Sequence, residues 1–219
     1  MFGKEFATPG RIAVKICGIT TLADALVAIH CGADALGFIL FSGSRRYLDP
    51  RTASDWMINL PAEVRKVAVM VNPTLDEVVR IAALPFIDAI QLHGHESPEF
   101  CRRVAEKGIS FIKAIPMGES DSLEVTPHFF TESVLLDSSS RRGFGGTGET
   151  FQWEAGRKFI EEHPGLRVTV AGGLTPDNVA EAVRTMRPFA VDVTSGVEST
   201  PGRKEPGRVR DFIAVVRSA

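Results

Sequence analysis

A cysteine and a lysine stand two positions apart at the end of an apolar run near the start of the chain. The run covers residues 11–17 (RIAVKIC), where Lys15 and Cys17 interrupt a pattern typical of a buried strand. Side chains alternate along a strand, so Lys15 and Cys17 share one face while Val14 and Ile16 take the other. A free thiol is only about 3% thiolate at pH 7, and a neighbouring ammonium raises that fraction. Cys17 is therefore a candidate general base.

A carboxylate ends another apolar run of the chain. Asp137 is the last residue of SVLLD (133–137). One interpretation is that it caps a turn, and the other is that it forms an acid–base pair with Cys17. To hold a proton near neutral pH, its carboxyl group would need partial burial. The remaining cysteines, Cys31 and Cys101, fall in or at the end of predicted helices and are interpreted as packing residues.

A second acidic residue is expected next to Lys15. In the last apolar run, 189–194 (FAVDVT), Asp192 and Thr194 share one face of the predicted strand. This strand neighbours the first one if the sheet closes into a barrel. A buried ammonium needs an opposite charge, so the sequence predicts an internal ion pair between Lys15 and Asp192.

Three glycine-containing stretches follow late strands and are candidates for binding phosphate. They are residues 143–149 (GFGGTGE), 171–179 (AGGLTPDNV) and 194–198 (TSGVE). Glycines let backbone amides approach an oxyanion, and such loops commonly bind phosphate in parallel barrels, although each stretch alone could be a plain tight turn. The residues predicted for this phosphate site are Gly172, Gly173, Ser195 and Gly196.

Two further pairs of side chains could bind parts of a ligand. Arg45 and Arg46 follow the second apolar run and are either solvated surface charges or a bidentate grip on a carboxylate. His93 and His95 flank a glycine, which is a spacing that invites a metal. No third ligand with suitable spacing accompanies them, so no metal site is predicted.

Eight apolar runs alternate with amphipathic helical stretches along the chain. The runs cover residues 11–17, 35–40, 66–71, 88–93, 110–115, 133–137, 167–172 and 189–194. Strands that alternate with helices predict a parallel sheet. Eight such units within 219 residues favour a single-domain (β/α)8 barrel over an open doubly wound sheet, which would not need the eighth unit. Residues 11–219 would form the barrel and residues 1–10 an N-terminal extension. In such barrels the active site lies at the C-terminal ends of the strands, which is where Cys17 and Asp137 fall.

The composition excludes several classes of function. The chain is 44% hydrophobic and 24% charged, with a formal net charge of −2, which gives no electrostatic basis for binding nucleic acid or an anionic membrane. Its longest apolar stretches fall short of the roughly 18 residues of a membrane span. The three cysteines show no paired spacing, which favours a reducing cytoplasm.

Together these stretches resemble the phosphoribosylanthranilate isomerase family of tryptophan biosynthesis. The matching motifs run in family order from about residue 13 to the C-terminus and are KICGIT, GFILFSGSRRYLDP, VAVMVNP, IQLHG, LLD, GGTG, AGGLTPDNV and VDVTSGVE. The resemblance implies a cofactor-free (β/α)8 isomerase that converts N-(5-phosphoribosyl)anthranilate to 1-(2-carboxyphenylamino)-1-deoxy-D-ribulose 5-phosphate by an Amadori rearrangement. It also implies that Cys17 is the general base, Asp137 the general acid and Arg46 the residue that holds the anthranilate carboxylate. The phosphate would bind in the loops that contain Gly172 and Ser195.

Two positions depart from the family pattern. Glu149 stands where lysine is common after GGTG, and His95 stands where an aspartate is usual. Loss of a lysine near a dianionic substrate would weaken binding, unless Glu149 faces solvent. The alternatives are another sugar-phosphate barrel enzyme, such as a synthase that uses Lys113, and a non-catalytic sugar-phosphate-binding barrel. The expected partner is the small-molecule substrate, and the expected assembly is a monomer or a homodimer.

Overall fold

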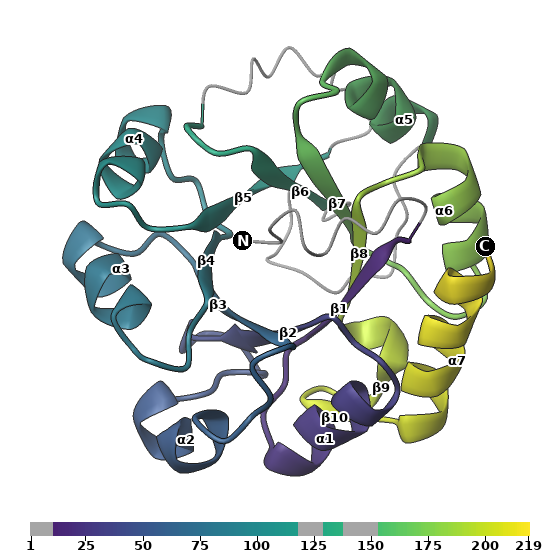
Figure 1. Cartoon of the computed structure of the whole chain (residues 1–219), viewed down its shortest axis with the longest axis horizontal. Helices are drawn as coiled ribbons and strands as arrows, with labels where there is room; N and C mark the ends of the chain where they lie inside the picture. The colour runs from purple at the N-terminus through teal and green to yellow at the C-terminus, as the bar shows by residue number, and fades with distance from the viewer. Residues whose placement is uncertain (1–10, 118–128, 138–152) are drawn as a thin grey trace.

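Eight parallel strands close into a barrel in the computed structural model, which describes residues 11–117, 129–137 and 153–219. Each strand pairs with the next in chain order, and β8 pairs with β1. The strands are β1 (Ala13–Cys17), β2 (Ala35–Ile39), β3 (Arg65–Met70), β4 (Ala89–Leu92), β5 (Phe111–Pro116), β6 (Ser133–Asp137), β7 (Arg167–Ala171) and β8 (Ala190–Val193). Figure 1 looks down this barrel. The predicted (β/α)8 barrel is confirmed, and the closing β1–β8 pair excludes the open sheet.

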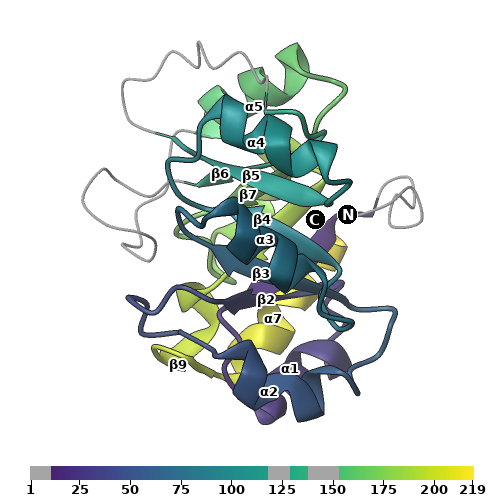
Figure 2. The ribbon, with the colours of Figure 1, turned by 90° about the vertical axis from the view of Figure 1, so that its left-hand side faces the viewer.

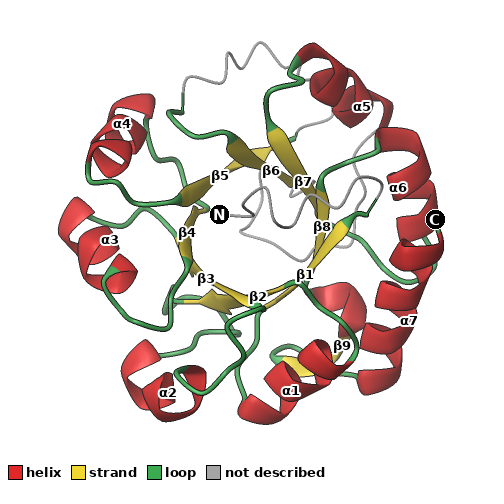
Figure 3. Ribbon diagram, viewed as in Figure 1, coloured by secondary structure: helices red, strands yellow, loops and turns green. Residues whose placement is uncertain are grey.

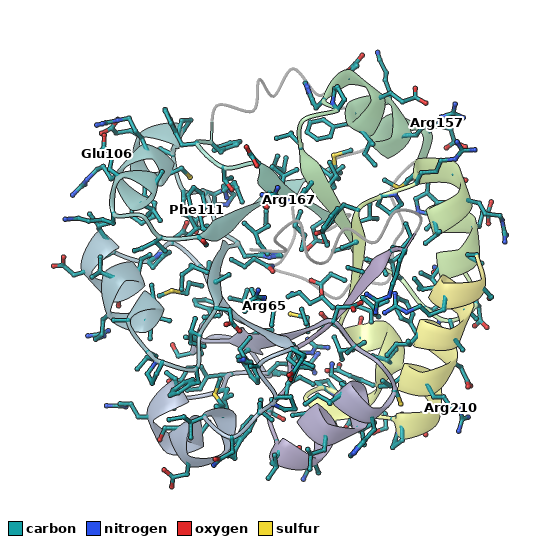
Figure 4. The ribbon with its side chains drawn as sticks, viewed as in Figure 1. Arg65, Glu106, Phe111, Arg157, Arg167 and Arg210 are labelled. Carbon is teal, nitrogen blue, oxygen red and sulfur yellow. The ribbon has the colours of Figure 1, made fainter. Side chains whose placement is uncertain are left out.

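Helices form a ring outside the strands (Figure 3). Those in the described residues are α1 (Leu22–His30), α2 (Pro50–Met57), α3 (Leu75–Ala82), α4 (Pro98–Glu106), α5 (Trp153–Glu162), α6 (Val179–Met186) and α7 (Pro206–Ser218). Side chains at their starts fix where they begin. The Thr74 side chain accepts a hydrogen bond from the Glu77 amide, and the Glu77 carboxylate accepts one from the Thr74 amide. Charged residues on the outer helix faces, such as Glu106, Arg157 and Arg210, point to solvent (Figure 4).

The alternation of side chains along the strands produces two layers of core. Val14 and Ile16 of β1 face outward into the layer between strands and helices. The inside of the barrel holds a separate cluster of small and apolar residues: Ala13, Ala35, Val67, Ile112, Ala114, Leu135, Ala171 and Ala190. Lys15 and Cys17 share the inward face of β1 with Ala13, so the polar end of this face lies above an apolar floor.

A hairpin follows β8 at the C-terminal end of the barrel. The short 3-10 helix η2 (Ser195–Val197) leads into β9 (Glu198–Thr200), which pairs in antiparallel fashion with β10 (Arg203–Lys204). Helix α7 then returns along the barrel, so that β9 and the C-terminus lie at opposite ends (Figure 2). There, Arg217 donates hydrogen bonds to the carbonyls of Ile12 and Gly32, which lie beside the first two strands.

Some expectations fall on residues outside the described ranges. They are the N-terminal extension of residues 1–10 and the glycine stretch 143–149, which includes Glu149. No helix in the described residues is long and apolar enough to cross a membrane.

Candidate active site

A cavity of about 390 Å³ opens where the strands end. Most of the side chains predicted from the sequence line it, although they are spread along the whole chain. The lining includes Cys17, Arg46, Asp137, Gly172, Gly173, Asp192 and Ser195. Gly196 follows directly in η2. Lys15 lies one step deeper on the same face of β1, and its side chain is completely buried.

The Cys17 thiol ends β1 in a buried position, with 4% of the residue exposed. Burial raises the pKa of this thiol, while Lys15 and, to a smaller degree, Lys204 lower it. Lys15 therefore lowers the pKa of Cys17, as expected. Burial raises this pKa by more, because the thiolate loses its hydration and the attraction of the ammonium does not fully compensate for that loss. The pKa of the Cys17 thiol therefore lies above its ordinary value.

Lys15 and Asp192 form the predicted ion pair. The Lys15 Nζ atom lies 2.8 Å from Asp192 Oδ2, and both side chains are buried. The register explains the contact, because the two residues are directly opposite in the β1–β8 pair. Burial alone would lower the pKa of Lys15, but Asp192 and Cys17 raise it above its ordinary value. Lys15 therefore remains a cation inside the barrel.

Gly37 of β2 provides the space that the two polar side chains of β1 occupy. It is the register partner of Cys17. A Cβ atom at this position would lie 2.6 Å from Cys17 Sγ and 3.0 Å from Lys15 Nζ. Side-chain atoms do not approach this closely, so any side chain at position 37 would displace Cys17 or Lys15. Sequence reasoning missed this residue, because nothing in the ALGFI run marks its contact with β1.

Asp137 ends β6 and bonds to a histidine that directly follows β4. His93 Nε2 lies 3.0 Å from Asp137 Oδ2, and His93 Nδ1 lies 2.7 Å from Gln91 Nε2. Because an amide nitrogen donates, Nδ1 accepts from Gln91, and the ring proton on Nε2 points to Asp137. The Asp137 residue is 7% exposed, so the expected burial is present. Sequence reasoning placed His93 at a strand end but did not join it to Asp137.

Arg46 reaches the cavity from the loop after β2 and is paired with Glu198 of β9. Its Nε atom lies 2.9 Å from Glu198 Oε1, and its Nη2 atom lies 2.6 Å from Oε2. Both charged groups are largely buried. One edge of the guanidinium therefore binds a carboxylate of the protein itself, which sequence reasoning did not anticipate. Arg45 also lines the cavity.

The loop after β7 turns through two glycines, and the loop after β8 packs closely against it. Gly172 and Gly173 have φ angles of 88° and 62°, which is the left-handed region that favours glycine. A Cβ atom at Gly196 would lie 1.9 Å from the Leu174 carbonyl oxygen, so these two loops are in close contact. Asn178 donates to the Gly173 carbonyl at 2.9 Å and holds the first loop. The sequence did not reveal this contact of the Asn178 side chain.

The described residues contain no group of three His, Cys, Asp or Glu side chains that could hold a metal ion. His93 contacts Asp137, and the His95 amide donates to the Asn72 side chain at 2.7 Å. The two histidines of the HGH stretch therefore have separate partners. A thiol and a carboxyl group that line one cavity could each exchange a proton with the same bound molecule.

The fold and the site together define a class of protein. It is a (β/α)8 barrel with a thiol and a carboxyl group in one cavity at the C-terminal ends of its strands, glycine loops after β7 and β8, and an arginine that lines the same cavity. In enzymes with this fold, the active site lies at this end of the barrel, and the loops after strands 7 and 8 frequently bind phosphate.

Comparison with known proteins identifies the family. The family model of N-(5'-phosphoribosyl)anthranilate (PRA) isomerase matches residues 14–215. The isomerase of Geobacter metallireducens is 46% identical over 202 residues, which are 92% of this chain and 97% of that protein. The corresponding enzyme of Thermotoga neapolitana is 44% identical over 202 residues, with the same coverage of 92% and 97%.

Solved structures agree with this assignment. The crystal structure of phosphoribosyl anthranilate isomerase from Thermotoga maritima superposes with a TM-score of 0.85 at 37% identity, covering 95% of this chain and 100% of that one. A structure of the isomerase in complex with reduced 1-(o-carboxyphenylamino)-1-deoxyribulose 5-phosphate has a TM-score of 0.81 at 37% identity, with the same coverage. This chain belongs to the N-(5'-phosphoribosyl)anthranilate isomerase family.

Proposed function

We propose that this chain is the isomerase that converts N-(5-phosphoribosyl)anthranilate to 1-(2-carboxyphenylamino)-1-deoxy-D-ribulose 5-phosphate in tryptophan biosynthesis. The observation that carries the proposal is that the Cys17 thiol and the Asp137 carboxyl group line one cavity, from strands β1 and β6. An Amadori rearrangement needs one acid and one base on a single substrate, and this cavity provides both.

Asp137 acts first as the general acid. It protonates the furanose ring oxygen, and the bond between C1 and that oxygen breaks to give a Schiff base at C1. His93 fixes the orientation of the carboxyl group through the contact to Oδ2. The iminium formed in this step is itself the electron sink for the next one, so the mechanism uses no cofactor.

Cys17 acts second as the general base. Its thiolate removes the proton from C2, and the resulting enolamine tautomerises to the ketone. The ion pair of Lys15 and Asp192 lies directly beneath this thiol, and the Lys15 ammonium lowers the pKa of Cys17 against the effect of burial. Lys15 therefore supports the base. Asp192 itself raises the pKa of Cys17, and its supporting role is to hold the Lys15 ammonium in place beneath the thiol. Each positioned proton transfer contributes about 10²–10⁴-fold to the rate.

Anchors at two ends of the cavity hold the substrate. Arg46 binds the anthranilate carboxylate through its Nη1–Nη2 edge, since Glu198 occupies the Nε–Nη2 edge. The phosphate binds the backbone of the two glycine loops. The residues proposed for the phosphate are Gly172, Gly173, Ser195 and Gly196.

Two buried oxygens of the cavity favour a sugar between these anchors. Gln91 Oε1 and Asp192 Oδ1 have no hydrogen-bond partner within the described residues, and both residues line the cavity. A buried acceptor without a partner is costly. The hydroxyl groups of a ribose are donors that would satisfy both.

Turnover of phosphoribosylanthranilate by the purified protein tests the proposal, because the substrate fluoresces and its loss can be followed directly. We expect loss of fluorescence at a rate proportional to enzyme concentration. Protein that binds a reduced product analogue but converts no substrate would instead be a non-catalytic sugar-phosphate-binding barrel.

The site of action and the assembly are part of the same proposal. Cys17, Cys31 and Cys101 are free thiols, and Cys17 must stay reduced to act as a base. We therefore place the enzyme in the reducing cytoplasm. Its assembly is a monomer or a homodimer, which light scattering of the purified protein decides.

A further inference from the structure

The hairpin after β8 carries two buried charges at the rim of the cavity. Glu198 begins β9 and Lys204 ends β10, and both are about 5% exposed. Between them, Ser199, Thr200 and Arg203 are exposed. Charged side chains are rarely buried unless they are paired, so Glu198 and Lys204 are expected to have specific partners.

Lys204 binds the ends of the first and last strands together. Its Nζ atom donates to the Cys17 carbonyl at 2.6 Å, to the Thr194 carbonyl at 3.2 Å and to Glu198 Oε1 at 3.0 Å. An ammonium has three hydrogens, and these three acceptors use all of them. The contact to Cys17 joins residues 187 positions apart. Lys204 therefore fixes the backbone that carries the thiol.

Glu198 lies between Lys204 and Arg46. It accepts hydrogen bonds from Arg46 Nε and Nη2, from Lys204 Nζ and from the Gly202 amide. Arg46 and Lys204 keep the pKa of this carboxyl group below its ordinary value although burial acts in the opposite direction. One carboxylate thus neutralises one of two cations, and the three groups together retain a single positive charge beside the cavity.

The aliphatic part of the Arg46 side chain packs against the backbone just after Cys17. Gly18, the residue after Cys17, has a φ angle of 73°. A Cβ atom at this position would lie 2.8 Å from Arg46 Cδ. The methylenes of Arg46 therefore rest on the chain directly after the thiol, while Glu198 holds the guanidinium at its other end.

We propose that Glu198 and Lys204 are positioning residues, which together couple the carboxylate anchor Arg46 to the base Cys17. Glu198 holds the Nε–Nη2 edge of the guanidinium so that the Nη1–Nη2 edge is presented to the substrate. Lys204 holds the carbonyl of Cys17 and so sets the place of the thiol. This inference rests on the proposed function, because it gives the two residues their roles through the anchor and the base.

The first test uses two ligands that differ only in the carboxylate. They are the reduced product analogue, 1-(2-carboxyphenylamino)-1-deoxyribitol 5-phosphate, and its phenylamino counterpart without the carboxylate. In the variant Glu198→Gln, we expect the carboxylated analogue to bind about tenfold or more weakly, since charge-assisted hydrogen bonds carry this much affinity. The counterpart should keep its affinity. Equal changes for both ligands, or none for either, would overturn the role of Glu198.

A double-mutant cycle separates positioning from general damage to the fold. In the background Arg46→Ala, the change Glu198→Gln should have no further effect on the affinity of the carboxylated analogue. Arg203→Met is the matched control, because it removes an exposed charge from the same hairpin and should leave both affinities unchanged. If Glu198→Gln does not fold, Glu198→Asp keeps the charge but shortens the reach, and the same selective loss is expected.

The second test concerns Lys204. In Lys204→Met we expect kcat to fall about tenfold or more with little change in the affinity of the product analogue. The acidic limb of the pH profile of kcat/KM should move to higher pH, because a cation that lowers the pKa of Cys17 has been removed. Lys204→Arg keeps the positive charge, so the acidic limb of the profile should stay at the wild-type pH. This variant can also be used if Lys204→Met does not fold. An unchanged kcat and profile would overturn the role of Lys204.

The tests separate this inference from the proposed function. If wild-type protein does not convert phosphoribosylanthranilate, the proposed function fails, whatever the variants do. If the wild type turns over and Glu198→Gln binds both analogues as the wild type does, the proposed function stands and the coupling fails.

Discussion

Cys17 and Asp137 are the proposed base and acid, and their strands end at the same cavity although 120 positions separate them in the sequence. We predict that Cys17→Ala and Asp137→Asn each lower kcat by about 10²–10⁴-fold, the range of a positioned proton transfer. The affinity of the reduced product analogue should stay nearly intact, because neither substitution removes a proposed anchor. Loss of substrate fluorescence gives kcat, and Cys31→Ala is the control for removing a thiol elsewhere. Near-normal turnover in Cys17→Ala would show that another group is the base.

The buried state of Cys17 also predicts the pH dependence of the enzyme. Burial raises the pKa of this thiol above its ordinary value of 9.0, and the base must be a thiolate to act. Because the thiolate fraction grows as pH rises, kcat/KM should still increase between pH 7 and 9. Lys15→Met should move this limb to yet higher pH, since Lys15 lowers the pKa. Steady-state kinetics across this range measure the limb. A plateau that begins below pH 7 would contradict a raised pKa in the free enzyme.

Some contacts between the side chains of the site could be predicted from the sequence, and others could not. Alternation along β1 and β8 was sufficient to pair Lys15 with Asp192, because strand register fixes which residues meet. The partner of Arg46 was not predictable in this way. Both Arg46 and Glu198 lie beyond the barrel strands, 152 positions apart, and periodicity does not determine the path of a loop. The bond between His93 and Asp137 joins the residue after β4 to the end of β6. These two strands are not neighbours, so the pairing of adjacent strands does not predict the contact.

At the level of elements, the eight strands fall within about one or two residues of the predicted runs, and β6 covers the predicted residues 133–137. Strands buried on both faces are continuous apolar runs, so their position is plain in the sequence. The positions at which a strand has no room for a side chain are harder to recognise in the sequence. β2 needs a glycine at position 37 only because β1 brings a lysine and a cysteine to the neighbouring face.

This crowding predicts the effect of adding one methyl group to β2. In Gly37→Ala, the new Cβ would lie 2.6 Å from Cys17 Sγ, so the thiol or the strand must move. We expect kcat to fall about 100-fold, as for a misplacement of about 1 Å, together with a loss of stability of about 1–3 kcal/mol. Gly165→Ala is the control, because an added Cβ there meets no atom within 4 Å. Turnover and urea denaturation measure the two effects. Wild-type kcat in a folded Gly37→Ala variant would show that the strand shifts without disturbing the base.

At the scale of the whole molecule, the pairing of β1 with β8 closes the sheet of eight strands into a barrel. The ion pair of Lys15 and Asp192 joins residues 177 positions apart across this pair. Lys204 joins the same two strands at their C-terminal ends. At the opposite end, Arg217 of α7 pairs with Asp34, 2.7 Å away, which in turn accepts from the Val14 amide. Charged contacts thus join β1 to β8 at two levels along the barrel, and at the opposite end they tie α7 to the start of β1. The ion pair of Lys15 and Asp192 lies between these two ends, beneath the candidate active site.

The contribution of the middle contact to stability can be measured with single and double substitutions. Asp192→Leu leaves the Lys15 ammonium buried without its partner and should lower the free energy of unfolding by about 3–5 kcal/mol. The double variant Lys15→Met/Asp192→Leu removes both charges and should lose much less, because no buried charge remains. Urea denaturation at pH 7 gives both values. Since the pKa of Lys15 is raised in the folded protein, the stabilisation by the pair is complete below the ordinary value of 10.5 and is lost as pH rises through the raised pKa. If the double variant loses as much stability as Asp192→Leu, the shapes of the two side chains, and not their charges, hold this part of the barrel together.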